Sequence, residues 1–176
     1  MGKGRRYRYR YIKSKGRWSA NLQEVQNQVF SFTGSSISSI KFDLCTNPAQ
    51  ASTSVSQQYT VKNLYFNFQI ECSSDLIDYI NSLTGYIMYV PQGMDVGSNY
   101  PKQHPEYIMA MRFFGTPESR GANTQGLRNP LSIRTRLARR LQTGDKIIFL
   151  LIGVNSNSNS VGINLNGVVR WWTKAN

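Results

Sequence analysis

The sequence has few of the side chains that enzymes and metal sites use. Its 176 residues include one histidine, His104, two cysteines, Cys45 and Cys72, and nine scattered carboxylates. A zinc site of the usual kind needs about four ligands, mostly His and Cys. A nucleophilic triad would depend wholly on His104, and the surrounding sequence matches no such motif. We therefore expect no catalytic residues, no metal site and no cofactor, and we interpret His104 beside Glu106 as a loop histidine with ordinary hydrogen bonds.

Long apolar runs are also missing. No stretch of 18 apolar residues is present, and no apolar stretch follows the arginines near the N-terminus. The sequence therefore offers neither a membrane-spanning helix nor a secretory signal. Two widely spaced cysteines are more typical of reduced thiols than of a disulfide framework. These absences predict a soluble protein in a reducing compartment, without membrane insertion.

Negative charge is scarce beside positive charge. Lys and Arg number 21 against nine Asp and Glu, which gives a formal net charge of +12 at pH 7. Hydrophobic residues make up 40% of the chain, as in globular rather than disordered proteins. A net charge this far from neutrality indicates an acidic partner, and nucleic acid is the first candidate.

Most of the excess charge lies at the N-terminus. Residues 1–17 contain eight basic side chains and no acid, whereas the rest of the chain contains 13 basic and nine acidic side chains. A like-charged block repels itself and buries no apolar surface. We expect a basic arm over residues 1–20 and one folded domain over residues 21–176, a length that suits a single hydrophobic core.

The rest of the chain has the period-two alternation of β-strands. In the longest run, apolar side chains occupy every second position from Leu64 to Ile70, as in a half-buried antiparallel strand. One short helix is expected after Ser73, carrying apolar residues up to Leu83. Strands without alternating helices predict an all-β sandwich or barrel. The eight expected strands are Gln26–Thr33, Ile37–Leu44, Gln58–Cys72, Gly85–Val90, Tyr107–Phe114, Leu131–Leu137, Asp145–Val154 and Gly162–Thr173.

Three connections between these strands, 45–57, 91–105 and 116–129, are long for a compact domain. Such loops are uncommon unless they contact something. A fourth connection, the polar run Asn155–Ser160 between two apolar strands, predicts a solvated hairpin loop.

The arm alternates arginine with tyrosine. In an extended chain the two residue types face opposite sides, so that guanidinium groups can bind phosphates while the rings stack on exposed bases. This pattern suits sequence-tolerant binding of single-stranded nucleic acid. A tail that only solubilises the protein, or that serves as a nuclear import signal, is the alternative. The predicted nucleic-acid-binding residues of the arm are Arg5, Arg6, Tyr7, Arg8, Tyr9, Arg10, Tyr11, Lys13, Lys15 and Arg17.

A second basic stretch lies between Arg128 and Lys146. Arg134 and Arg136 are two positions apart and share one face of the expected strand. With Arg139 and Arg140 they would form a basic sheet face. Such a face binds phosphates or pairs with the acids of a neighbouring subunit, and the sequence leaves both open.

The last strand contains two adjacent tryptophans, Trp171 and Trp172, which must point to opposite faces of the sheet. One belongs in the core. The other faces a partner subunit, because interfaces are enriched in Trp, or lies under a loop of the same chain. The preceding Asn166-Gly167 predicts a β-bulge that re-aims these residues.

Three segments carry a resemblance to a known family. They are Tyr86–Gly93 (YIMYVPQG), His104–Gly115 (HPEYIMAMRFFG) and Leu131–Gly144 (LSIRTRLARRLQTG). Together with the order of basic arm, eight strands with long loops and aromatic last strand, they resemble the capsid proteins of circovirus-like viruses with circular single-stranded DNA.

This resemblance implies a viral jelly roll of two four-stranded sheets. It also implies that sixty copies close a T=1 icosahedral shell, with the arms directed inward onto a single-stranded DNA genome. Family members carry a nuclear import signal in the arm, and their long loops meet the host. The implied partners are therefore further copies of the chain, the genome, host import factors and an attachment receptor, and the implied locations are the virion and the host nucleus.

Two other function classes stay open from the residues alone. One is a β-barrel module that binds single-stranded nucleic acid as a monomer or dimer. The other is a sugar-binding or enzymatic jelly roll, which would need clustered carboxylates or a metal site that this sequence does not assemble.

Overall fold

The computed structural model describes residues 17–32, 37–47, 58–72, 80–115, 131–156 and 160–175. These residues form nine strands, a short α-helix and a 3₁₀ helix. The strands are β1 (Ser19–Phe32), β2 (Ile37–Thr46), β3 (Tyr59–Cys72), β4 (Ile80–Val90), β5 (Ile108–Gly115), β6 (Leu131–Thr135), β7 (Arg139–Leu141), β8 (Lys146–Asn155) and β9 (Val161–Ala175).

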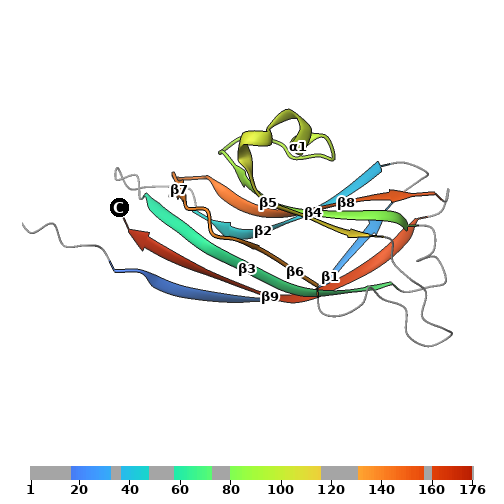
Figure 1. The fold of residues 1–176 in the computed structure, drawn as a ribbon, viewed down its shortest axis with the longest axis horizontal. Coiled ribbons are helices and arrows are strands. Elements are labelled where there is room, and N and C mark those ends of the chain that lie inside the picture. Colours follow the sequence, from blue (N-terminus) through green and yellow to red (C-terminus); the bar gives the residue numbers. More distant parts are fainter. Residues whose placement is uncertain are drawn as a thin grey trace, which may run out of the picture.

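The strands form two antiparallel sheets that stack face to face (Figure 1). Sheet A has the order β1-β9-β3-β6, and β7 also pairs with β3, beyond the end of β6. Sheet B has the order β2-β8-β4-β5. Because β6 and β7 occupy one strand position between them, each sheet has four positions, and the predicted all-β architecture of eight strand positions is confirmed.

The order of pairing identifies the fold as a jelly roll. The first strand pairs with the last (β1 with β9), and moving inward along the chain β2 pairs with β8, β3 with β6 and β7, and β4 with β5. The chain is thus an antiparallel ribbon folded back at its middle. Pairing of β3 with β9 and of β4 with β8 rolls this ribbon into the two sheets.

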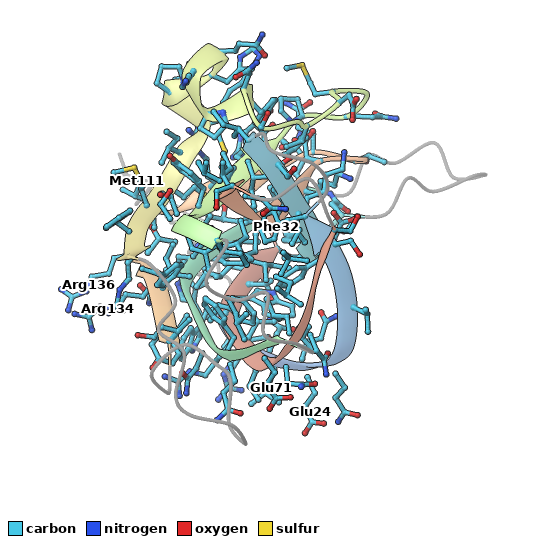
Figure 2. All side chains as sticks on the ribbon, turned by 90° about the vertical axis from the view of Figure 1, so that its right-hand side faces the viewer. Glu24, Phe32, Glu71, Met111, Arg134 and Arg136 are labelled. Carbon is cyan, nitrogen blue, oxygen red and sulfur yellow. The ribbon has the colours of Figure 1, made fainter. Side chains whose placement is uncertain are left out.

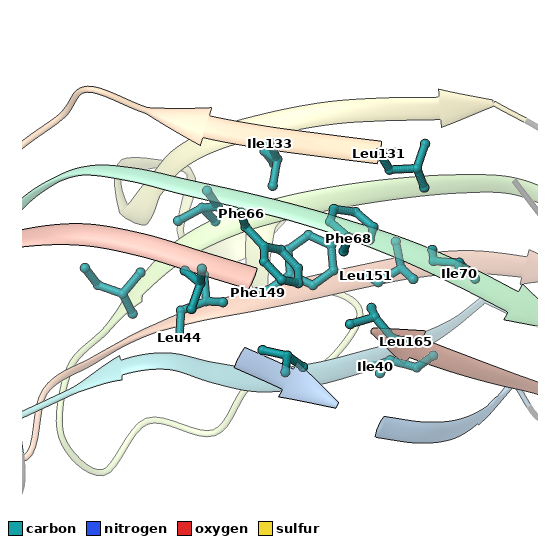
Figure 3. Close-up of a cluster of buried hydrophobic side chains, with 14 of the residues drawn as sticks. Ile40, Leu44, Phe66, Phe68, Ile70, Leu131, Ile133, Phe149, Leu151 and Leu165 are labelled. Atoms are coloured by element: carbon teal, nitrogen blue, oxygen red, sulfur yellow. The ribbon is translucent and has the colours of Figure 1, made fainter. Parts of the chain in front are cut away.

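Aromatic rings fill the space between the sheets (Figure 3). Phe66 and Phe68 of β3 stack with ring centroids 4.6 Å apart, and Phe149 of β8 lies 5.1 Å from each in a T-shaped arrangement. Phe66 and Phe149 are fully buried and Phe68 is 2% exposed. The alternation predicted for β3 is confirmed, since Leu64 and Ile70 are also buried.

Glycine is required where these rings meet the backbone. A Cβ atom at Gly153 would lie 2.8 Å from a ring carbon of Phe32, and one at Gly85 would lie 2.6 Å from a ring carbon of Phe114. Both distances are far below van der Waals contact, so larger residues at these positions would displace the core rings.

A bulge in β1 shapes sheet A. β1 has an extra residue between Val25 and Gln28, opposite Asn166 and Gly167 of β9. The sequence predicts a bulge at Asn166-Gly167, but the extra residue lies in the partner strand. Gly167 instead allows β9 to approach β3, because a Cβ there would lie 2.6 Å from the carbonyl oxygen of Asn67.

A folded loop covers part of the outer face of sheet B. It contains α1 (Tyr100–Gln103) and the 3₁₀ helix η2 (Pro105–Tyr107), and it lies above the sheet in Figure 1. Val96 and Tyr100 of this loop pack against Met88 and other outward-facing side chains of sheet B. The segment expected as an irregular connection is therefore partly helical and closely packed.

The last part of the helix predicted after Ser73 is a strand. Residues 73–79 lie outside the described residues, but Ile80 and Leu83 are buried members of β4. A bulge between Ile80 and Ser82 adds a residue to β4, so Ile80 and Leu83 both face the core. Apolar residues three positions apart also occur on one face of a helix, which is why the sequence pattern predicts a helix here. Within the described ranges no helix is long and apolar enough to cross a membrane.

Two further predictions need correction. β1 begins at Ser19, seven residues before the predicted start, because its first half is an edge segment in which Leu22 is 65% exposed and no alternation marks the strand. The predicted hairpin after Asn155 is a crossover, since β8 belongs to sheet B and β9 to sheet A.

Candidate nucleic-acid interface

The arm residues Arg5, Arg6, Tyr7, Arg8, Tyr9, Arg10, Tyr11, Lys13 and Lys15 lie outside the described residues. The description begins at Arg17, which is exposed, and Trp18, which is half-buried. The next residue, Ser19, pairs with Thr173 of β9. The arm therefore joins the fold at the end of sheet A where β1 begins and β9 ends (Figure 1).

The outer face of sheet A carries basic side chains at this end. One cross-strand row runs from Leu22 of β1 through Arg170 of β9 and Tyr65 of β3 to Arg134 of β6. Arg170, Tyr65 and Arg134 each follow a buried residue and so point away from the core, and Leu22 is exposed. Side chains directly opposite on neighbouring strands lie about 5 Å apart at Cβ, so this row is a continuous surface.

Two more rows lie closer to the start of β1. In one, Ala20, Trp172 of β9 and Lys62 of β3 are paired across the sheet. In the other, Thr60 is paired with Lys174 and Arg140. The five cations of the three rows form what we call the basic face: Lys62, Arg134, Arg140, Arg170 and Lys174.

Aromatic rings lie between these cations. The Lys62 Nζ atom lies 3.8 Å from the centroid of the Trp18 ring. The Cζ atom of Arg170 lies 5.3 Å from the Trp172 centroid and 5.9 Å from the Tyr65 centroid. These distances are in the range of cation–π attraction, which fixes the ring orientations at the surface.

The ion pairs of the described residues lie away from the basic face. The described cations that pair with acids include Lys41, which bonds to Asp95, and Lys146, which lies 3.3 Å from Asp43, all on sheet B or its covering loop. Within the described ranges no member of the basic face forms an ion pair. On sheet A, Glu71 of β3 is paired with Asn164 near the other end of the face, whereas Glu24 of β1 is paired with Val168, one row from Arg170. Figure 2 shows both carboxylates apart from Arg134. The positive charge of the basic face is therefore not neutralised by the described acids.

The structure separates the four arginines of the second basic stretch. Arg134 and Arg136 both project into solvent at the side of the molecule (Figure 2), and Arg140 is exposed on the same sheet face as Lys174. Arg139 points to the other side, where it donates a hydrogen bond to the carbonyl oxygen of Glu106 and lies 5.2 Å from the Tyr89 ring. The structure thus brings Arg134 and Arg140 into the basic face and places Arg139 in a contact with the covering loop.

Trp171 and Trp172 lie on opposite faces of sheet A, as the alternation of strand side chains requires. Trp171 packs against the main core, whereas Trp172 stands on the outer face beside Arg170. The predicted role of Trp172 at a subunit interface stays a prediction. Sequence reasoning missed Trp18, Tyr65, Lys62, Arg170 and Lys174, which lie far apart along the chain and become neighbours only through the pairing of β1, β9 and β3.

A buried carboxylate organises the opposite sheet. Asp145 is 4% exposed and accepts hydrogen bonds from the Tyr89 hydroxyl at 2.7 Å and from the backbone N–H groups of Gln92 and Gln142 at 3.1 and 2.8 Å. Burial of the Tyr89 hydroxyl is the larger cause, and its hydrogen bond to Asp145 the next, that raises the pKa of Tyr89 to about 12. Among the described residues no three His, Cys, Asp or Glu side chains cluster in a way that could hold a metal ion.

His104 also has an ordinary environment. Its Nδ1 atom lies 3.3 Å from a carboxylate oxygen of Glu106, and its ring stacks on Tyr107 with centroids 5.3 Å apart. Cys45 is a buried free thiol whose pKa is raised by burial. The His104 contacts thus lie within the covering loop.

Comparison with known proteins gives likenesses of fold only. No family model and no curated protein matches the sequence. The infectious bursal disease virus structure (Gx strain) is 7% identical with a TM-score of 0.46, over 89% of this chain and 32% of that chain. The Desmodium yellow mottle tymovirus structure is 9% identical with a TM-score of 0.39, over 94% and 91%. A decameric BFDV capsid protein is 8% identical with a TM-score of 0.36, over 90% and 99%.

This chain spans about a third of the infectious bursal disease virus chain and nearly all of the other two. All three TM-scores are below 0.5, so the strand order of the two sheets carries the fold assignment.

Proposed function

We propose that this chain is a viral capsid protein that assembles with further copies of itself and packages single-stranded DNA. The observation that carries the proposal is the position of the basic arm, which joins the jelly roll at the basic face of sheet A. Jelly rolls serve as capsid, lectin and cupin domains, so the fold alone does not choose among these functions. A polycationic arm beside a polycationic sheet face favours a nucleic-acid partner.

The arm and the basic face would act on the same strand of nucleic acid. Trp18 lies against Lys62, which places the last basic residue of the arm, Arg17, at the edge of the basic face. Phosphates that leave the arm would therefore meet Arg140, Arg170 and Lys174 next. Such contacts are independent of base sequence, as packaging of a whole genome requires. Their strength also falls steeply as the salt concentration rises.

The finer features of the proposal follow the resemblance described above. Sixty copies would close a T=1 shell in the virion, with the arms on the inside. Assembly in the host nucleus would use the arm as an import signal that host import factors bind, and the long loops would meet an attachment receptor.

A nucleic-acid-binding module without assembly is the second candidate. The same arm and basic face would serve it equally well. The two functions differ in stoichiometry: a capsid protein mixed with a short single-stranded oligonucleotide forms large particles, whereas a module saturates as a small complex. Sedimentation velocity of the purified chain with such an oligonucleotide separates them.

Deletion of residues 1–17 tests the packaging role. β1 begins at Ser19, so the deletion removes no strand pairing, and we expect a folded domain that has lost most of its co-purifying nucleic acid. A full-length variant with Arg5, Arg6, Arg8 and Arg10 replaced by Gln is the matched control, because it keeps the length and removes charge. Undiminished nucleic acid in both proteins would overturn the assignment of the arm.

A further inference from the structure

The aromatic rings of the basic face have a feature that phosphate binding alone does not explain. Trp172 and Tyr65 lie on the solvent side of sheet A, and among the described elements no helix or strand packs over them (Figure 1). Burying a large ring in the core would be favourable, yet three rings stand at this surface beside cations. A sheet face that bound only phosphates would need the cations and not the rings.

The arrangement of these rings suits nucleobases. Arg170 lies between two of them, 5.3 Å from the Trp172 centroid and 5.9 Å from the Tyr65 centroid. Trp172 follows Arg170 by two positions on β9, which is about 6.6 Å along the strand, and Tyr65 is its cross-strand neighbour. A guanidinium group held between two rings can pair with a phosphate while each ring offers a surface to an adjacent base.

Packing of the rings on the stems of Lys62 and Arg170 is the alternative explanation. Long basic side chains commonly cover apolar surface in this way. That explanation accounts for Lys62 and Arg170. It does not account for Arg134, Arg140 and Lys174, which extend the positive charge to both sides of the rings and have no described carboxylate partner.

We propose that Trp172, Tyr65 and Trp18 form a base-stacking platform that selects single-stranded nucleic acid over duplex. In this assignment Arg170, Lys62 and Arg134 hold the phosphates of the stacked nucleotides. A duplex presents its phosphates but keeps its bases stacked on one another, so it gains only the electrostatic part of the binding. The inference rests on the proposed binding of nucleic acid, and it gives Trp172 a role different from the subunit contact that the sequence predicts.

The test compares a single-stranded dT oligonucleotide of about 20 nucleotides with a duplex of the same length, each labelled with fluorescein and titrated with the full chain. Stacking of one base contributes about 1–3 kcal/mol, so Trp172→Ala should weaken single-strand binding by about 5- to 150-fold. Binding of the duplex and the dependence of affinity on salt should stay unchanged. Val168→Ala, which truncates an exposed side chain on the same strand and face, is the matched control and should change neither.

An arginine variant gives the complementary result. Arg134→Ala should weaken single strand and duplex alike and should lower the slope of log affinity against log salt by about 0.7 for the single strand. Trp172→Phe should restore most of the single-strand affinity. If Trp172→Ala does not fold, Tyr65→Leu serves as the second test of the platform.

The possible results separate the base-stacking platform from a subunit contact at Trp172 and from a failure of the proposed function. If Trp172→Ala weakens binding of the single strand and of the duplex equally, or lowers the slope of log affinity against log salt, the platform is overturned. The proposed binding of nucleic acid then still stands. Unchanged binding with a changed sedimentation coefficient overturns it in favour of a subunit contact. Failure of the unmodified chain to bind either oligonucleotide removes the proposed function together with the platform.

Discussion

The hydroxyl of Tyr89 donates a 2.7 Å hydrogen bond to the buried carboxylate of Asp145. The bond joins β4 to the turn that precedes β8, and two backbone N–H groups, of Gln92 and Gln142, complete the coordination of the same carboxylate. A single side chain therefore holds the start of the covering loop and the turn before β8 in place.

Asp145→Asn should destabilise the fold. The amide keeps one acceptor oxygen and places its own donor against groups that also donate, so charge-assisted bonds are lost and a buried N–H is left unpaired. We expect the free energy of unfolding to fall by about 2–4 kcal/mol, measured by denaturant titration. Asp95→Asn is the control, because the Asp95 side chain is 99% exposed; equal effects of the two substitutions would contradict the role of Asp145.

Stability should fall at alkaline pH. Burial is the largest cause that raises the pKa of Tyr89 and of Tyr100 to about 12, against an ordinary value of about 10 in the unfolded chain. Between pH 10 and 12 the folded state holds more protons than the unfolded state, so stability is complete below pH 10 and decreases as the pH rises toward 12. Denaturant titrations at pH 8 and pH 11 measure this, and absorbance at 295 nm should show at least three tyrosines that ionise late, because burial also raises the pKa of Tyr59. Ionisation of all ten tyrosines near pH 10 in the folded protein would contradict it.

Phe149 lies at the centre of the aromatic cluster between the sheets, so its truncation should be costly. Its ring contacts Phe42, Phe66 and Phe68 at centroid distances of 5.1 to 5.4 Å. Phe149→Ala should lower the free energy of unfolding by roughly 3–5 kcal/mol, since the cavity cannot close by collapse of neighbouring rings alone. Phe113→Ala on the edge strand β5, where the side chain is 65% exposed, should cost much less, and the reverse order would contradict this packing.

The arm should bind without regard to base sequence. Arg8→Glu combined with Arg10→Glu removes phosphate contacts and adds repulsion, so affinity for dA, dC and dT oligonucleotides should fall by similar factors. Fluorescence anisotropy at fixed salt measures the three affinities. A large change in their ratio would show that these arginines contact base edges instead.

Local alternation was sufficient for much of the fold. In β3 the apolar residues from Leu64 to Ile70 occupy every second position, and all of them face the core. The predicted sides of Trp171 and Trp172 follow from the same rule. A bulge interrupts the alternation, as in β4, where one extra residue lets both Ile80 and Leu83 face the core.

The basic face could not be predicted from sequence because its members are distant along the chain. Lys62, Arg134 and Arg170 belong to three strands, and only the pairing of β3 with β6 and β9 brings them together. Conversely, Arg139 and Arg140 are adjacent in sequence and point to opposite sides. Charge runs along the sequence therefore predict only part of the basic sheet surface.

The central claim is that the basic end of this jelly roll condenses nucleic acid within an assembly of identical chains. Electron microscopy of the purified full-length protein, with single-stranded DNA present, tests this most directly. The account predicts closed particles of uniform diameter with density inside that is lost when residues 1–17 are deleted. Protein that stays monomeric or dimeric on the grid at every salt concentration, with or without DNA, would contradict it.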